Sequence, residues 1–172
     1  MYIYLVSFEN TEKRLLFAVA KNVKETFGFD VRVSWVAAPF KYAYNAQRKQ
    51  YIAERVVDYL STLNYPRLVR MLAILSSDLY AGDLEFVFGF GTKRDAVVST
   101  FRLWSTEERL FFERVFKVVN LTLGKTFGLD YCKDHKCVMH PYFSLTDMDA
   151  KAKSFCTYCK TKLEATLSQL TL

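Results

Sequence analysis

The sequence predicts an α/β fold in which helices flank a mixed β-sheet. Three observations favour this class. Strand-like and helix-like patterns alternate from the start of the chain, a segment rich in strand-forming residues follows in the middle, and a long amphipathic helix follows that. With 172 residues the chain is predicted to form one domain over 1–172, with the sheet and helices over about 1–128 and a C-terminal subdomain over about 129–172.

The first quarter of the chain contains two strand patterns and two helix patterns. The opening MYIYLVSFEN predicts a strand. Between Asn10 and Phe27 apolar residues recur at intervals of three and four, which predicts a helix capped by Asn10 and stopped by Gly28. Alternation over 31–35 then predicts a short strand, and a second helix is predicted near 45–63.

The middle of the chain carries the remaining strand signals. Residues 70–75 form a compact apolar run, and 84–91 are rich in strand formers. Because Gly91-Thr92-Lys93-Arg94 favours a turn, 84–91 and 95–101 are predicted to pair as a hairpin.

Two helices are predicted beyond the hairpin. Ser105-Thr106-Glu107-Glu108 reads as a capping box that opens the longest helix, which continues to Gly128. Periodicity is lost after Gly128 until a short helix near 160–170. The intervening tail is therefore predicted to be clamped by its cysteines and not packed on a core.

Composition excludes some functions and disfavours others. No apolar run approaches the length that spans a bilayer, so a membrane span is excluded. The first residues lack the basic and apolar regions of a signal peptide, which favours a cytoplasmic protein. The net charge of +6 favours acidic partners, but the basic residues are dispersed among carboxylates, so nucleic acid is an unlikely partner.

All four cysteines lie in the last quarter of the chain, as two close pairs. Cys132 and Cys137 are separated by four residues, and Cys156 and Cys159 by two. This spacing predicts one tetrahedral zinc ion, and four protein ligands leave no position for a reacting water, so the predicted role is structural. The alternative is four reduced core cysteines. His135 or His140 is a further alternative, as a replacement ligand.

Several short segments along the chain form a recognisable set. In the tail they are GLDYC at 128–132, CVM at 137–139 and FCTYC at 155–159, followed by Lys162-Leu163. Upstream they are AYNAQRKQY at 43–51, DLY at 78–80, FVFG at 86–89 and AVVS at 96–99. Together these segments resemble the archaemetzincin family, a group of zinc peptidases. The resemblance covers nearly the whole chain and implies a metzincin-like fold.

The same resemblance implies a catalytic motif, HExxHxxGxxH, directly before the first cysteine. In the family its three histidines bind a catalytic zinc, and its glutamate is the general base. The histidine positions are here Leu121, Lys125 and Tyr131, and the glutamate position is Thr122, so none of the four is retained. Both histidines of the chain lie downstream, and zinc peptidase activity by the family mechanism is not expected.

The resemblance also assigns roles to residues around the former site. Met139 occupies the Met-turn position, although a gap-filling core methionine would look the same. One expectation goes beyond the resemblance: Lys125 places its ammonium beside Tyr131 and Asp130, in the space where the family holds its metal. The alternative is an exposed helix lysine that points to water. An edge strand near Asp83–Gly89 is expected to border the cleft, where it could add a peptide as an extra strand or simply be protected by its charges.

Three functional hypotheses follow. The first is a catalytically inactive archaemetzincin-like protein with one structural zinc, which binds a peptide or protein in the remaining cleft. The second is a metal-independent hydrolase that uses Lys125, Tyr131 and Thr122. The third is a nucleic-acid-binding zinc protein, which the lysines around the cysteines would support; they are Lys133, Lys136, Lys151, Lys153, Lys160 and Lys162.

Overall fold

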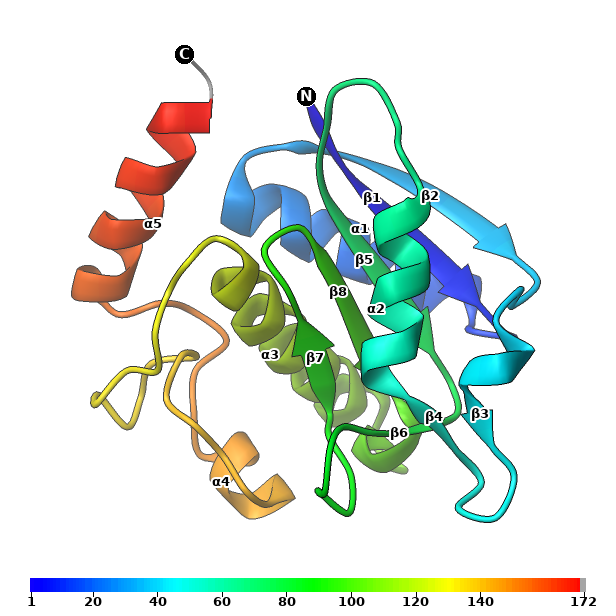
Figure 1. The fold of residues 1–172 in the computed structure, drawn as a ribbon. Coiled ribbons are helices and arrows are strands. Elements are labelled where there is room, and N and C mark those ends of the chain that lie inside the picture. Colours follow the sequence, from blue (N-terminus) through cyan, green and yellow to red (C-terminus); the bar gives the residue numbers. More distant parts are fainter. Residues whose placement is uncertain (171–172) are drawn as a thin grey trace.

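A computed structural model describes residues 1–170 and has a five-stranded sheet at its centre (Figure 1). The strand order is β2-β1-β5-β8-β7. Four strands are parallel to their neighbours, and β7 runs antiparallel to β8 at one edge. The predicted mixed α/β fold is therefore confirmed. The strands are β1 (Tyr2–Phe8), β2 (Asp30–Val36), β5 (Leu68–Leu75), β7 (Gly89–Gly91) and β8 (Asp95–Ser99).

Helices cover both faces of this sheet. Helices α1 (Lys13–Phe27) and α3 (Glu108–Thr126) pack on one face, and α2 (Ala53–Thr62) packs on the other. The central strand β5 shows why, because its successive side chains point to opposite faces. Leu72 and Ile74 join the core under α1 and α3, while Met71 and Ala73 join the core under α2. Both faces of β5 are thus buried, as expected for a parallel strand.

A second, three-stranded sheet replaces the first part of the predicted helix at 45–63. It contains β3 (Tyr44–Asn45), β4 (Gln50–Ile52) and β6 (Asp78–Tyr80). The prediction was wrong because the carboxamide oxygen of Asn45 accepts hydrogen bonds from the backbone N–H groups of Gln47 and Arg48, at 3.1 and 3.2 Å. This side-chain bond closes a turn and stabilises a hairpin in place of helix.

The helix ends agree with the sequence at one position and differ at two. Gly28 ends α1 with a φ of 76°, as predicted. Asn10 does not cap α1, which begins at Lys13 without a side-chain cap. Ser105 does not form the predicted capping box, because α3 begins at Glu108 and the Ser105 hydroxyl accepts from the N–H of Glu107. Two 3₁₀ turns complete the body of the fold, η1 (Lys41–Ala43) and η2 (Phe101–Leu103).

The predicted hairpin is confirmed, but it is shorter than expected. Only Gly89–Gly91 pairs with β8, which itself ends at Ser99. Residues 84–88 form no strand, although the Val87 N–H bonds the Leu79 carbonyl and the Ser99 N–H bonds the Phe88 carbonyl. The rim expected at Asp83–Gly89 is therefore an irregular segment that leads into a short edge strand.

The tail, yellow to red in Figure 1, follows α3 and contains two helices, α4 (Leu145–Asp149) and α5 (Thr157–Leu170). Helix α4 was not predicted, and α5 begins three residues earlier than the predicted position 160. Met139, Met148 and Leu163 are buried in the same core as α1 and α3, so the prediction that the tail does not pack on a core was wrong. Within residues 1–170 no helix has the length and apolar character needed to cross a membrane.

Candidate functional site

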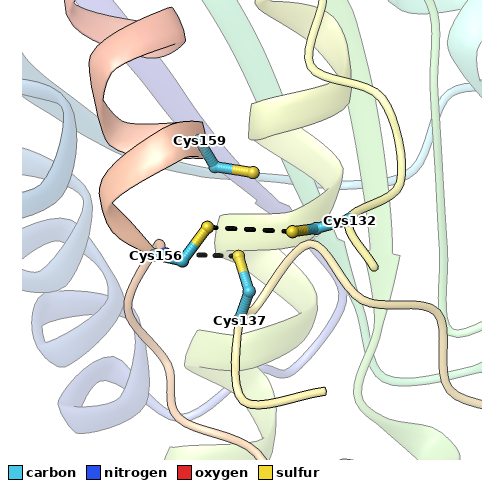
Figure 2. Close-up of side chains that lie close together, drawn as sticks. All are labelled: Cys132, Cys137, Cys156 and Cys159. Atoms are coloured by element: carbon cyan, nitrogen blue, oxygen red, sulfur yellow. Dashed lines mark hydrogen bonds between the residues drawn. The ribbon is translucent and has the colours of Figure 1, made fainter. Parts of the chain in front are cut away.

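Four thiols converge between the loop after α3 and the start of α5 (Figure 2). Cys132 and Cys137 belong to the loop, Cys156 precedes α5, and Cys159 lies in its first turn. All four Sγ atoms lie within 4.8 Å of one another, and those of Cys132 and Cys156 are 3.7 Å apart. Zinc–sulfur bonds of about 2.3 Å in a tetrahedron place the sulfurs about 3.8 Å apart. The predicted cysteines therefore come together in a geometry that suits one tetrahedral ion.

Backbone N–H groups point at these sulfurs. Asp134 donates to Cys132 Sγ and Met139 donates to Cys137 Sγ, both at 3.4 Å, and Cys156 donates to Cys137 Sγ at 3.3 Å. Such bonds favour the thiolate, which is the form that binds a metal. The loop backbone is thus already arranged around negatively charged sulfurs.

The acidities of the thiols differ with their surroundings. The backbone N–H of Cys159 lowers the pKa of Cys156, whereas burial raises the pKa of Cys137 and of Cys159. All four cysteines are free of disulfides. A metal that binds here has to displace protons from the buried thiols, so its apparent affinity rises with pH.

A buried lysine adds a second indication of a charged centre. Lys151 is 6% exposed, and its Nζ has no hydrogen-bond partner among the described residues. Burial lowers the pKa of Lys151 to about 8, and the nearby Cys137 acts in the opposite direction. Four thiols beside an unpaired buried ammonium are a donor set and a charge environment that fit a zinc ion held by thiolates.

The two histidines are not part of this cluster. Nδ1 of His140 donates to the Cys132 carbonyl oxygen at 2.8 Å, and the His135 ring contacts Nε2 of His140 at 3.1 Å. The group of potential ligands that converges contains the four cysteines alone. The alternative in which a histidine replaces a cysteine is therefore not supported by the geometry.

A cleft of about 510 Å³ lies beside the position of the family's catalytic motif. Its first wall is the segment Leu84–Gly89, its floor is formed by Leu121 and Thr122 of α3, and Tyr131 and Pro141–Phe143 form the other wall. Phe143 is 84% exposed. A cleft is thus present where it was expected, but an irregular segment over 84–88 borders it in place of the expected edge strand, and its lining is largely apolar.

A polar network fixes the rim of this cleft. Arg48 donates to the carbonyl oxygens of Leu84 and Glu85, at 3.0 and 2.9 Å, and Gln50 also donates to Glu85. Gln50 and Arg102 both donate to the buried carboxylate of Asp78. Sequence reasoning did not identify this network, although Arg48, Gln50 and Asp78 belong to segments that carried the family resemblance.

Two of the positions that the resemblance assigns to the catalytic motif lie in the cleft floor and offer no metal ligand. Leu121 is partly buried against the core. Thr122 is 4% exposed, and its hydroxyl donates to the Val118 carbonyl oxygen at 2.7 Å. This hydroxyl is committed to the helix, and an alcohol at this position cannot replace a carboxylate as general base.

The other two positions contact each other. Nζ of Lys125 lies 4.2 Å from the centroid of the Tyr131 ring, as expected from the sequence. The expected contact of Lys125 with Asp130 is not seen. The Asp130 carboxylate instead lies 3.7 Å from Nζ of Lys162. Lys125 is also absent from the residues that line the cleft, whereas Tyr131 is among them. A cation and a phenol side by side do not make a zinc site.

Met139 is fully buried beneath α3. A Cβ atom on Gly124 would lie 2.7 Å from Met139 Sδ, so glycine allows this close approach. Met139 therefore packs where the Met-turn was expected, with the helix that carries Leu121 and Thr122 above it.

The comparisons agree with this geometry. The model of "Peptidase family M54" matches residues 10–165. The archaemetzincin of Methanopyrus kandleri is 37% identical over 98% of this chain and 99% of the relative. Its crystal structure superimposes with a TM-score of 0.89, covering 98% of this chain and 96% of that one.

A second solved structure, the archaemetzincin of Archaeoglobus fulgidus complexed with malonate, is 30% identical. It has a TM-score of 0.83 and covers 94% of this chain and 99% of that one. The four-cysteine tail, the cleft and these matches over nearly the full length lead to one conclusion: the chain belongs to the archaemetzincin family of peptidases.

Proposed function

We propose that this chain is a catalytically inactive archaemetzincin that binds an extended peptide or protein segment in its cleft and carries one structural zinc. The observation that supports this is the combination of a retained cleft with lost ligands. Within residues 1–170 the four cysteines are the only group of three or more potential ligands that converges. The cleft floor holds Leu121 and Thr122 instead.

The role proposed for the zinc follows from its four protein ligands. A tetrahedral ion bound by Cys132, Cys137, Cys156 and Cys159 has no free position, so it would stabilise the tail without activating water. We also propose that the chain works in the cytoplasm, because free thiols in two close pairs suit a reducing compartment.

The edge strand supports an extended ligand. Hydrogen bonds from Ser99 to Phe88 and from Thr92 to Asp95 show which residue pairs of the β7–β8 ladder exchange backbone bonds. Because such pairs alternate in an antiparallel ladder, the backbone groups of Gly89 and Gly91 point away from β8, toward the open edge. A peptide can pair with these groups by β-addition.

The lining indicates the side chains that such a ligand carries. Phe86, Phe88, Tyr142 and Phe143 surround the cleft, and Glu85 is its only charged lining residue. Apolar or aromatic ligand side chains would be desolvated here at little cost. We therefore propose a hydrophobic peptide segment as the ligand class.

The two alternative hypotheses receive less support. A metal-independent hydrolase would need a free nucleophile, but the Thr122 hydroxyl bonds the Val118 carbonyl. A nucleic-acid surface would need free cations around the cysteines. Lys153, Lys160 and Lys162 lie 3.7–4.0 Å from the carboxylates of Glu113, Glu164 and Asp130, and Lys151 is buried. These contacts reduce the positive field of the tail.

Metal content tests the zinc part of the proposal. Mass spectrometry on untagged protein is expected to find about one zinc per chain, and Cys156→Ser is expected to lose it. A second tightly held zinc that survives this substitution would mean that a catalytic site exists despite Leu121, Thr122, Lys125 and Tyr131.

Peptide binding tests the cleft. Fluorescent peptides from a library of hydrophobic sequences are titrated against the protein by anisotropy, and the mixtures are then analysed by mass spectrometry for cleavage. Phe143→Ala is expected to weaken binding. The control is Phe17→Ala, which makes the same change at an exposed position of α1, outside the cleft. Peptide turnover that persists after metal removal would support the hydrolase hypothesis, and absence of any binding would reject the proposed function.

A further inference from the structure

Two lysines that are distant along the chain are buried, and only one of them has a hydrogen-bond partner. Lys117 in α3 is 5% exposed, and its Nζ donates to the Met148 carbonyl oxygen at 3.1 Å. Lys151 is 6% exposed, and its Nζ is the only buried side-chain amine within residues 1–170 that lacks a hydrogen-bond partner. Burying an ammonium without a hydrogen-bond partner destabilises a fold. The burial of Lys151 therefore calls for a nearby negative charge.

The segment that carries Lys151 runs beside the metal-binding loop. The Ala152 N–H donates to the Lys136 carbonyl at 3.2 Å, and the Val138 N–H donates to the Ser154 carbonyl at 3.0 Å. These two bonds enclose Cys137, which is 1% exposed. Lys151 therefore enters the buried space on the side where the most buried of the four thiols lies.

Two groups near Lys151 can supply negative charge, and one of them is buried. The Tyr142 ring covers the ammonium, with its centroid 4.3 Å from Nζ, and Lys117 adds positive charge. Asp147 also attracts Lys151, but its carboxylate is exposed to solvent and accepts from the Phe143 N–H. The buried group is Cys137. As a free thiol it carries no charge, but as a metal-bound thiolate it does.

We propose that Lys151 is the internal counter-cation of the four-cysteine metal centre. Four thiolates around a divalent ion leave a net negative charge on a centre whose Cys137 and Cys159 are buried. In a region of low dielectric constant, a fixed ammonium attracts that charge more strongly than the same ammonium would in water. This inference rests on the structural zinc proposed above and extends it to a residue that is not a ligand.

If Lys151 is the counter-cation, its replacement should raise the stability of the metal-free protein and lower the affinity for zinc. Replacing Lys151 by an apolar side chain removes a buried charge that has no hydrogen-bond partner in the metal-free chain, so the metal-free protein should gain stability. The same change removes the charge that balances the thiolates, so zinc should bind less tightly. A lysine with a purely structural role would shift both forms in the same direction.

The test compares Lys151→Met with Lys117→Met in the full chain. Zinc affinity is measured by competition with a chromophoric chelator, and melting temperatures are measured for zinc-loaded and chelator-treated protein. Lys151→Met should lower zinc affinity about tenfold, the lower end of what partners of metal ligands contribute, and raise the melting temperature of the metal-free form. Lys117→Met should destabilise both forms and leave zinc affinity unchanged. Lys151→Arg should keep most of the affinity.

The outcomes separate this inference from the proposal beneath it. If the unsubstituted chain binds zinc and Lys151→Met binds it equally tightly, the counter-cation is rejected and the metal centre stands. If the unsubstituted chain binds no zinc, both are rejected. Should Lys151→Met fail to fold, Lys151→Gln is used instead, because it removes the charge and keeps a polar side chain. Its zinc affinity is expected to fall by the same factor.

Discussion

Gly89 in β7 lies so close to Thr122 in α3 that a Cβ atom on Gly89 would be 2.5 Å from the Thr122 hydroxyl oxygen. The threonine cannot turn away freely, because that hydroxyl donates to the Val118 carbonyl oxygen. The strand that borders the cleft and the helix that forms its floor therefore meet at a glycine. The absence of a side chain at this point sets the width of the cleft floor.

Gly89→Ala is expected to destabilise the protein by about 1–3 kcal/mol, because the added methyl group overpacks this contact. Thr122→Ala alone is expected to cost about 1 kcal/mol or less, since it removes one hydrogen bond. Combined, the two changes should cost less than their sum, because the smaller side chain makes room for the methyl group. Urea unfolding of the three variants measures this coupling, and strictly additive losses would show that Thr122 does not limit the space at Gly89.

The buried carboxylate of Asp78 is expected to hold the rim of the cleft. It accepts from Arg102 and Gln50, and Arg102 lies 4.0 Å from the Phe86 ring centroid. Asp78→Asn should weaken these charge-assisted bonds and cost about 1–3 kcal/mol. Hydrogen exchange should then accelerate over 84–88. The exposed neighbour Asp83→Asn is the control, and equal exchange in both variants would contradict a role for Asp78 at the rim.

The sequence predicted those features of the fold that local chemistry decides. The stop at Gly28 depends on a positive φ, the β7–β8 hairpin on a turn signal, and the cysteine pairs on their spacing. The helix predicted over 45–63 is present as α2, but its first part was wrong, because the Asn45 side chain accepts from the Arg48 N–H and this bond competes with the helical pattern. The apolar pattern of the sequence does not reveal that the Asn45 side chain closes a turn.

The candidate site was predictable to a similar degree. The four cysteines converge as expected, and Tyr131 lies beside Lys125 as expected. The burial of Lys151 was not predicted, and the sequence placed it among the lysines around the cysteines that would support nucleic-acid binding. Lysine is seldom buried, and no local pattern signals its burial. Its position depends on backbone bonds to the loop around Cys137, which join residues distant along the chain.

The pair of Arg114 and Asp149 is expected to make stability depend on pH in acid. Arg114 donates to Asp149 at 2.8 and 2.6 Å, and this lowers the pKa of Asp149 below its ordinary value of 3.8. A lowered pKa contributes stability that is present above that ordinary value and is lost as pH falls through the folded-state pKa.

Asp149→Asn should therefore be less stable than the unsubstituted chain at neutral pH, by about 1 kcal/mol, and the difference should narrow below about pH 4. Denaturant unfolding at several pH values measures it. Asp30→Asn is the control, because the pKa of Asp30 is also lowered, by Lys24, but the pair is exposed. If the difference in unfolding free energy between Asp149→Asn and the unsubstituted chain stays constant as the pH falls, the Arg114–Asp149 pair is not the source of the pH dependence.

Metal removal is expected to destabilise α5 while the central sheet stays folded. The helix has 14 residues, and only Cys159 and Leu163 are buried among them. A helix of this length is marginal by itself, so its order depends on these two anchors. Chelation removes the link from Cys159 to the loop that holds Cys132 and Cys137. Hydrogen exchange should then accelerate over 157–170 while β1 and β5 stay protected, and circular dichroism should show a partial loss of helix. Cys156→Ser should reproduce this pattern without chelator, whereas continued protection of α5 after complete zinc removal would mean that packing at Leu163 alone holds the tail.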